Sequence, residues 1–253
     1  MTSAEKIRLD KLMLQRGLVP SRERAQALIL AGKVLINDQK MEKSGAMVDE
    51  SSSIRLLGDD LKFVSRGGLK LDHALEHWKI DAAGKICLDV GASTGGFTDC
   101  LLQHGAARVI AVDTGHGQIA FKFRSDPRVR LLEKTNARYL TGEKIGEAVD
   151  LIVMDVSFIS ATLLLPPVIA TAFPGNPALR RGCEVIVLVK PQFEAGRDKI
   201  GKGGIVKDEV VQQQAVEKVR RCIAALGAES TDVIESPIFG AEGNREFLLF
   251  ARF

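Results

Sequence analysis

The chain has 253 residues, of which 45% are hydrophobic and 26% are charged. These values exclude a mainly disordered protein, and the length suits one large domain or a medium domain with a small appendage. The formal net charge of +3 points to no particular partner.

Charge is unevenly distributed along the chain. Residues 1–43 hold nine lysines and arginines against five acids, whereas the remainder is close to neutral. On charge alone an ordinary solvated surface is the simpler interpretation. Contact between a basic N-terminal region and a polyanion is the alternative.

The four cysteines form no C-x-x-C pair and no metal-binding spacing with the four histidines. We therefore expect no metal, and a reduced, cytoplasmic setting. No apolar signal segment occurs near Met1. The stretch 156–179 carries no charge, but its apolar core, 158–173, is shorter than the roughly 20 residues of a spanning helix. Because this core also contains prolines, we expect a buried helix and no membrane partner.

Two short helical patterns open the chain. Apolar residues from Ile7 to Met13 form one face of a helix that ends at Gly17. Ser21 is a candidate N-cap for a second helix that ends at Gly32. A strand and a turn are expected at 34–38, and two more short strands near residue 48 and at 54–56. The pattern predicts a small α+β domain over residues 1–58 and a linker over 59–64.

A third helix opens at residues 65–68, and beyond residue 84 strands and helices alternate. Apolar runs predict strands, and amphipathic patterns predict helices at 97–103 and about 208–226. The strands are expected at 86–90, 108–113, 149–154, 184–189, 232–235 and 247–250. Buried strands that alternate with helices predict a Rossmann-like, doubly wound α/β sheet over residues 65–253.

The loop from Leu88 to Phe97 joins the first of these strands to its helix. Its glycines let the backbone approach a ligand, and Asp113 ends the next strand, where an acid accepts hydrogen bonds from ribose hydroxyls. This combination indicates an adenosine-containing cofactor. A nicotinamide cofactor is less favoured, because the loop is not G-x-G-x-x-G. A turn without ligand is disfavoured because Asp89 is costly to bury without a role.

Three charged residues stand where buried strands, or the turns beside them, should end: Asp155, Lys190 and Glu246. Lys70 lies on the third helix. A ribose 2′-hydroxyl must lose its proton to attack a methyl group, and a lysine beside a second ammonium can act as base or stabilise the alkoxide. The two carboxylates can position these groups. On spacing alone, two ordinary salt bridges are an equally good interpretation.

The loop pattern D-x-G-x-S-x-G-G-F resembles that of FtsJ-type methyltransferases. From Leu9 onward the chain resembles the TlyA family, known as hemolysins and as ribosomal RNA 2′-O-methyltransferases. The similarity is carried by these segments: 65–71 (SRGGLKL), 89–100 (DVGASTGGFTDC), Asp113 with 115–118, 155–159 (DVSFI), 187–197 (VLVKPQFEAGR) and 243–247.

The resemblance implies a methyltransferase that uses S-adenosylmethionine and acts on cytidine ribose in 16S or 23S ribosomal RNA, alone or in subunits. It implies a catalytic tetrad of Lys70, Asp155, Lys190 and Glu246. The cofactor-binding residues expected on this basis are Asp89, Gly91, Ser93, Thr94, Gly95, Gly96, Phe97, Asp113, Asn136 and Asp155.

The first sixty residues contain the segments 8–10 (RLD), 17–18 (GL), 21–22 (SR), Ala25 and 32–34 (GKV). In these segments they resemble an S4 domain, which presents basic side chains to RNA phosphates. The candidate RNA-binding residues are Arg8, Arg22, Arg24, Lys33 and Arg66. No aromatic residue precedes Phe63, so base stacking is not the expected mode of this domain.

Three other functions compete with this one. A pseudouridine synthase with an S4 domain would need no adenosine loop. A membrane-active hemolysin is supported only by the uncharged stretch. A non-catalytic ribosome-assembly factor would not need a complete tetrad.

Overall fold

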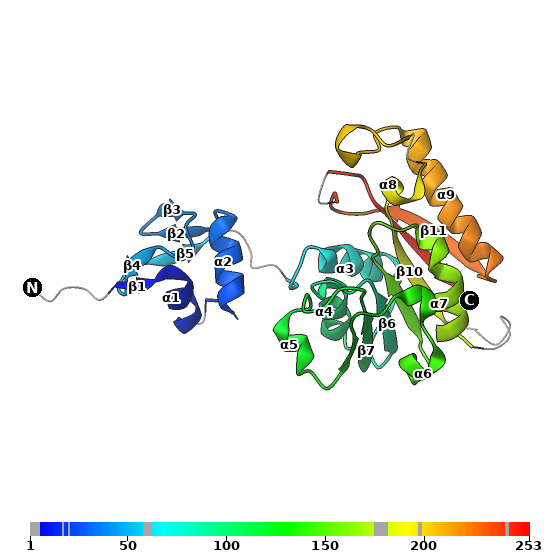
Figure 1. The fold of residues 1–253 in the computed structure, drawn as a ribbon, viewed down its shortest axis with the longest axis horizontal. Helices are drawn as coiled ribbons and strands as arrows, with labels where there is room; N and C mark the ends of the chain where they lie inside the picture. Colours follow the sequence, from blue (N-terminus) through cyan, green and yellow to red (C-terminus); the bar gives the residue numbers. More distant parts are fainter. Residues whose placement is uncertain are drawn as a thin grey trace, which may run out of the picture. The chain divides into compact units, whose positions relative to one another are not determined.

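The computed structural model describes residues 6–16, 18–19, 21–57, 62–174, 182–196, 199–240 and 243–253. The chain divides into two compact units, Met1–Lys62 and Phe63–Phe253 (Figure 1). Residues 59–61, half of the linker expected at 59–64, lie outside the described residues. Phe63 is buried in the core of the second unit. The boundaries predicted at residues 58 and 65 remain predictions.

The first unit is an α+β fold with two small antiparallel sheets, β1–β4 and β3–β2–β5. Its elements are β1 (Lys6–Arg8), α1 (Leu9–Gln15), α2 (Arg22–Leu30), β2 (Val34–Ile36), β3 (Gln39–Met41), β4 (Met47–Asp49) and β5 (Ile54–Leu56). The Ser21 side chain accepts a hydrogen bond from the Arg24 amide at 3.2 Å, which confirms the predicted N-cap of α2. The helices and strands enclose one apolar core.

One expectation for this unit was wrong, and one strand was missed. Ile7 does not belong to the first helix: it lies in β1 and pairs with Val48 of β4. Strand β3 was not predicted, because its residues are largely polar and exposed. It follows a tight turn at Asn37 and Asp38, both with positive φ.

The second unit is built on a seven-stranded sheet in the order β11–β12–β10–β9–β6–β7–β8. Its strands are β6 (Ile86–Val90), β7 (Arg108–Val112), β8 (Val129–Leu132), β9 (Leu151–Met154), β10 (Glu184–Val189), β11 (Ser230–Glu235) and β12 (Phe247–Arg252). The pairs from β10 through β9, β6 and β7 to β8 are parallel, and β12 is antiparallel to both neighbours. The predicted, mostly parallel sheet is confirmed. Edge strand β8, only partly buried, was missed.

Helices cover both faces of this sheet, and the strand residues alternate between them (Figure 1). Leu88 and Val90 face the core that includes α7 and α9, while Cys87 faces the core that includes α3 and α4. The helices are α3 (Gly67–Trp78), α4 (Gly96–Gln103), α5 (Phe121–Arg124), α6 (Gly142–Ile145), α7 (Leu165–Ala172), α8 (Pro191–Glu194) and α9 (Glu209–Ala225), with 3₁₀ turns η1 (Ala137–Tyr139), η2 (Ala161–Leu163) and η5 (Lys202–Gly204).

One edge of the sheet collects the ends of four strands. Val90 of β6 pairs in register with Met154 of β9, and Met154 pairs with Val187 of β10. Val189 of β10 pairs with Phe247, the first residue of antiparallel β12. The residues that follow β6, β9 and β10 therefore meet the residue that precedes β12. Ligands bind at this edge in open parallel sheets.

Candidate active site

The loop after β6 is shaped by glycines. Gly91 has a φ of +87°, and a Cβ there would collide with the backbone carbonyl of Asp155. Gly95 has a φ of +93°, and a Cβ there would lie 2.7 Å from the ring of Phe123. Side chains are excluded at both positions, so the loop backbone packs directly against the segment that carries Asp155. Ser93 and Thr94 are exposed, while Gly96 and Phe97 are buried at the start of α4.

Asp89 is fully buried on the α4 side of the sheet. Its Oδ2 accepts a hydrogen bond from Thr98 Oγ1 at 2.6 Å, and its Oδ1 has no hydrogen-bond partner among the described residues. Burial raises the pKa of Asp89 to about 7, and the negative charges of Asp155 and Asp113 act in the same direction. An unpaired oxygen of this kind indicates a place for a donor from a ligand.

Asp113 follows β7, and its carboxylate bonds both the glycine loop after β6 and the loop after β7. Its Oδ2 accepts a hydrogen bond from the Ser93 amide at 2.8 Å, and its Oδ1 accepts one from the Gly115 amide at 2.6 Å. Each oxygen retains a lone pair for a ligand. The exposed Asn136 caps the short turn η1, where its side-chain oxygen accepts from the Arg138 amide at 3.0 Å.

The four residues of the expected tetrad form two ion pairs. Lys70 Nζ lies 2.5 Å from Glu246 Oε2, and both side chains are almost fully buried. Lys190 Nζ lies 2.5 Å from Asp155 Oδ1 in an ion pair that lacks hydrogen-bond geometry. The same Nζ donates a hydrogen bond to Ser157 Oγ at 2.9 Å. Each ammonium thus lies beside a carboxylate.

The two ion pairs lie at the same edge of the sheet. Lys190 and Glu246 flank the paired residues Val189 and Phe247 on adjacent strands. A Cβ on Gly67 would lie 3.9 Å from Asp155 Oδ2, so the start of α3 adjoins Asp155. Lys70 is one turn further along α3 and shares this face of the helix. The site therefore combines two cations and two anions beside the glycine loop.

Sequence reasoning missed an exposed aromatic residue next to these pairs. Phe158 is 91% exposed and has a φ of +65°, which a non-glycine residue rarely adopts. Its ring centre lies 5.3 Å from that of Phe193, just after Lys190. The signal was present in the sequence, because an apolar residue follows the charged end of a strand at Asp155. An exposed, strained residue of this kind marks a candidate functional position.

The candidate RNA-binding residues of the first unit divide into two kinds. Arg8 and Arg22 both bond the buried carboxylate of Asp10, with nearest contacts of 2.9 Å. The hydrogen bond from Arg8 is the main cause that holds the pKa of Asp10 far below its usual value. Lys33 is exposed and Arg24 is partly buried. In the second unit, exposed Arg66 donates to the Phe239 carbonyl at 3.1 Å.

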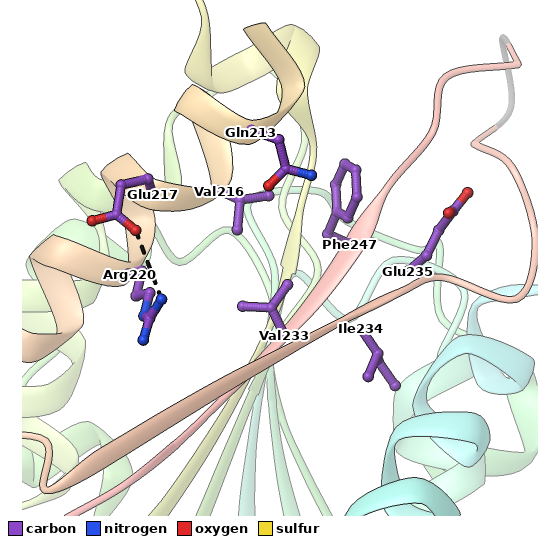
Figure 2. Close-up of a pocket in the computed structure, with 8 residues that line it drawn as sticks. All are labelled: Gln213, Val216, Glu217, Arg220, Val233, Ile234, Glu235 and Phe247. Carbon is purple, nitrogen blue, oxygen red and sulfur yellow. Dashed lines mark ion pairs between the residues drawn. The ribbon is translucent and has the colours of Figure 1, made fainter. Parts of the chain in front are cut away.

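A shallow groove of about 300 Å³ lies between α9 and β11 (Figure 2). It is lined by Gln213, Val216, Glu217, Arg220, Val233, Ile234, Glu235 and Phe247. None of the residues predicted for the site lines it, so the groove does not define the active site. Among the described helices, none has the length and apolar character needed to cross a bilayer.

Comparison with known proteins supports the same assignment over both units. Residues 63–253 match the FtsJ-like methyltransferase family, and residues 7–54 match the S4 domain. The chain is 44% identical over 250 residues to the 16S/23S rRNA (cytidine-2′-O)-methyltransferase TlyA of Mycobacterium tuberculosis, covering 98% of this chain and 91% of that protein. It is 39% identical over 243 residues to Hemolysin A of Brachyspira hyodysenteriae, covering 96% and 98%.

A solved structure from Streptococcus thermophilus, provisionally named a hemolysin, superimposes with a TM-score of 0.73. It is 39% identical in sequence, and the alignment covers 99% of this chain and 89% of that one. The family matches and the solved structure agree with the fold described above. The chain therefore belongs to the FtsJ-like methyltransferase family, in the TlyA group, and it carries an S4 domain before its methyltransferase domain.

Proposed function

We propose that this protein transfers a methyl group from S-adenosylmethionine to the ribose 2′-hydroxyl of a cytidine in ribosomal RNA. The observation that carries the proposal is the pair of lysine–carboxylate contacts, Lys70–Glu246 and Lys190–Asp155, at the sheet edge beside the glycine loop. The names of the M. tuberculosis relative and of a Campylobacter jejuni relative support the RNA substrate and the cytidine. Ribosomal RNA as substrate implies action in the cytoplasm.

The residues around the loop fit an adenosine-containing cofactor. Asp113 offers free lone pairs to ribose hydroxyls, and Asp89 Oδ1 offers an unsatisfied acceptor. Gly91 and Gly95 let the loop backbone pack against the Asp155 carbonyl and the Phe123 ring, which fixes the position of the loop. Gly96, Phe97, Asn136 and Asp155 complete the proposed binding set with Ser93 and Thr94. When bound, S-adenosylmethionine supplies a methyl group on a sulfonium, which a nucleophile attacks in line.

The two lysines supply the chemistry that a ribose hydroxyl needs. In our proposal Lys190 Nζ acts as the base in its neutral form and accepts the hydroxyl proton as the oxygen attacks, and Asp155 stabilises the ammonium that forms. Lys70, held by Glu246, places a second positive charge where the alkoxide develops. The net result is loss of the hydroxyl proton to the lysine–carboxylate pair. Both lysines are nearly buried, so their charges act with little screening by water.

The same region offers a contact for the RNA. Phe158 presents an exposed ring beside Ser157 and Lys190, and an unstacked base can lie against such a ring. The exposed Lys33, with Arg8, Arg22, Arg24 and Arg66, is the proposed set of phosphate contacts.

The decisive experiment is methyl transfer to ribosomal subunits that lack the modification, with labelled S-adenosylmethionine and mapping of the product. Label on a cytidine ribose supports the proposal, whereas no label above that of Lys190→Ala makes the protein a non-catalytic assembly factor. Calorimetric titration with S-adenosylmethionine separately tests the cofactor. Asp113→Ala is expected to weaken that binding about tenfold or more, because a charge-assisted hydrogen bond is lost. No binding at all would favour a pseudouridine synthase or a membrane-active hemolysin.

A further inference from the structure

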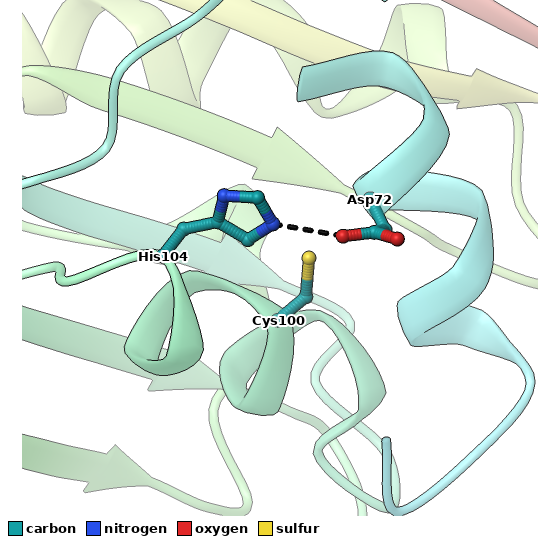
Figure 3. A group of neighbouring side chains, drawn as sticks. All are labelled: Asp72, Cys100 and His104. Atoms are coloured by element: carbon teal, nitrogen blue, oxygen red, sulfur yellow. Dashed lines mark hydrogen bonds and ion pairs between the residues drawn. The ribbon is translucent and has the colours of Figure 1, made fainter. Parts of the chain in front are cut away.

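A group of three side chains that the proposed reaction does not use lies between α3 and α4 (Figure 3). Asp72 belongs to α3, while Cys100 and His104 belong to α4 and its C-terminal cap. His104 Nε2 lies 2.8 Å from Asp72 Oδ1, and the three potential ligand atoms all lie within 4.8 Å of one another. Figure 3 shows the thiol of Cys100 directed toward the imidazole–carboxylate contact.

The spacing of these residues explains why they converge. Cys100 and His104 are four residues apart, so they stand one above the other on the same side of α4. Asp72 reaches them from the facing helix. The prediction of no metal rested on the absence of C-x-x-C pairs and of metal-binding spacings between cysteines and histidines, and it overlooked this helical pair.

We propose that Asp72, Cys100 and His104 form a binding site for a zinc ion. A thiolate, an imidazole and a carboxylate together match the ligand preferences of Zn²⁺ and exclude Mg²⁺ and Ca²⁺, which take oxygen ligands. Tetrahedral ligation places neighbouring ligand atoms roughly 3.3–3.7 Å apart. The His104–Asp72 contact would open by about half an ångström, and the thiol would close on the ion.

The exposed fractions of the three side chains indicate the side from which an ion enters the site. Cys100 is fully buried and Asp72 is nearly so, but 29% of the His104 side chain is exposed. The His104 side provides the path, and a water molecule completes the four ligands. The ion would link α3, which carries Lys70, to α4, which begins at the glycine loop. Its role is therefore to fix the distance between two helices of the proposed site.

The test uses the full chain, stripped with a chelator and then titrated with Co²⁺ alone. We expect a single saturable site whose thiolate gives a charge-transfer band in the near ultraviolet, and Zn²⁺ should displace the cobalt and abolish the band. Cys100→Ser should lose the band. His104→Gln should weaken Co²⁺ binding at least about tenfold, since even outer partners of a metal ligand change affinity by 10–100-fold. Matched controls are Cys222→Ser on α9 and His73→Gln on α3, which should bind cobalt as the wild type does.

A stability measurement gives a second readout. Zn²⁺ in excess should raise the Tm of the wild type by several degrees, because a ligand that binds only the folded state stabilises it. The Tm of His104→Gln should rise less at the same Zn²⁺ concentration, and this partly exposed position keeps the test valid if Cys100→Ser does not fold. The proposal is overturned if the wild type shows no thiolate band at saturating Co²⁺, or if His104→Gln binds the metal as tightly as the wild type.

Discussion

At Asp89 the fold buries a carboxyl group with one oxygen satisfied by Thr98 and the other without a partner among the described residues. Its pKa is raised to about 7 by burial, whereas the unfolded chain titrates near the ordinary value of 3.8. Between these values the native state holds more protons than the unfolded state. The free energy of unfolding therefore falls as pH rises through this window, by up to about 1.4 kcal/mol for each pH unit.

Asp89→Asn removes this proton-linked contribution. We expect the Tm of the wild type to fall relative to that of the variant as pH rises from about 4.5 to about 7.5. The measurement is a series of thermal melts of both proteins without cofactor. Parallel pH profiles would show that Asp89 titrates normally in the native state.

The two tetrad lysines allow binding and chemistry to be separated. Lys190→Ala and Lys70→Ala should each keep the fold and the affinity for S-adenosylmethionine, because neither lysine is proposed to contact the cofactor. Methyl transfer should fall about 10²–10⁴-fold, as expected for loss of a general base or of a preorganised charge. Single-turnover rates on saturating ribosomal subunits measure this effect. Wild-type rates in Lys190→Ala would refute the tetrad mechanism.

Substitution by arginine sharpens the same test. Lys190→Arg and Lys70→Arg keep the charge but should not restore activity, because a guanidinium is bulkier and does not give up its proton. The alternative role for Lys70 is a phosphate contact, since this residue lies on α3 outside the sheet. That role would weaken RNA binding while single-turnover chemistry at saturating RNA stayed intact.

At the scale of the element, the turn between β6 and α4 requires a glycine at position 91, because no other residue type fits there. Gly91→Ala adds a methyl group that collides with the carbonyl of Asp155, at a φ of +87° that side chains rarely adopt. We expect the loop to shift, with weaker cofactor binding measured by calorimetry and slower methyl transfer. Gly142→Ala is the matched control, since a Cβ there meets nothing within 4 Å. Equal cofactor affinities in the two variants would contradict this account of the turn.

Elements with strong periodicity were predictable from the sequence, and those set by tertiary pairing were not. The apolar strand at 86–90 and the helix near 208–226 matched β6 and α9 closely, because each buries a continuous face. Strand β1 was read as helix, since its pairing with β4 depends on residues some forty positions away. The strand ends at Asp155, Lys190 and Glu246 were visible, but which lysine contacts which acid depends on strand order and register.

On the scale of the whole molecule, we expect the first unit to bind ribosomal RNA and the second unit to bind the cofactor. A chain that begins at residue 59 retains Phe63, which is buried against Gly68, and so keeps the core of the second unit. This truncated chain should bind S-adenosylmethionine as the full chain does and lose affinity for ribosomal RNA. Binding by the full chain should also weaken steeply with salt, as phosphate contacts release counterions. Equal methylation of subunits by both proteins would argue against an RNA-anchoring role for the first unit.

The antiparallel insertion of β12 has a consequence for synthesis on the ribosome. Strand β12 lies between β10 and β11 but follows both in the chain, so a nascent polypeptide exposes the apolar edge of β10 until β12 emerges. Glu246 arrives with that strand, after the other three members of the tetrad. A message that stops before this point would yield a protein with a glycine loop but an incomplete tetrad and an open sheet edge. Such fragments should be substrates for chaperones and proteases and should not yield a partly active enzyme.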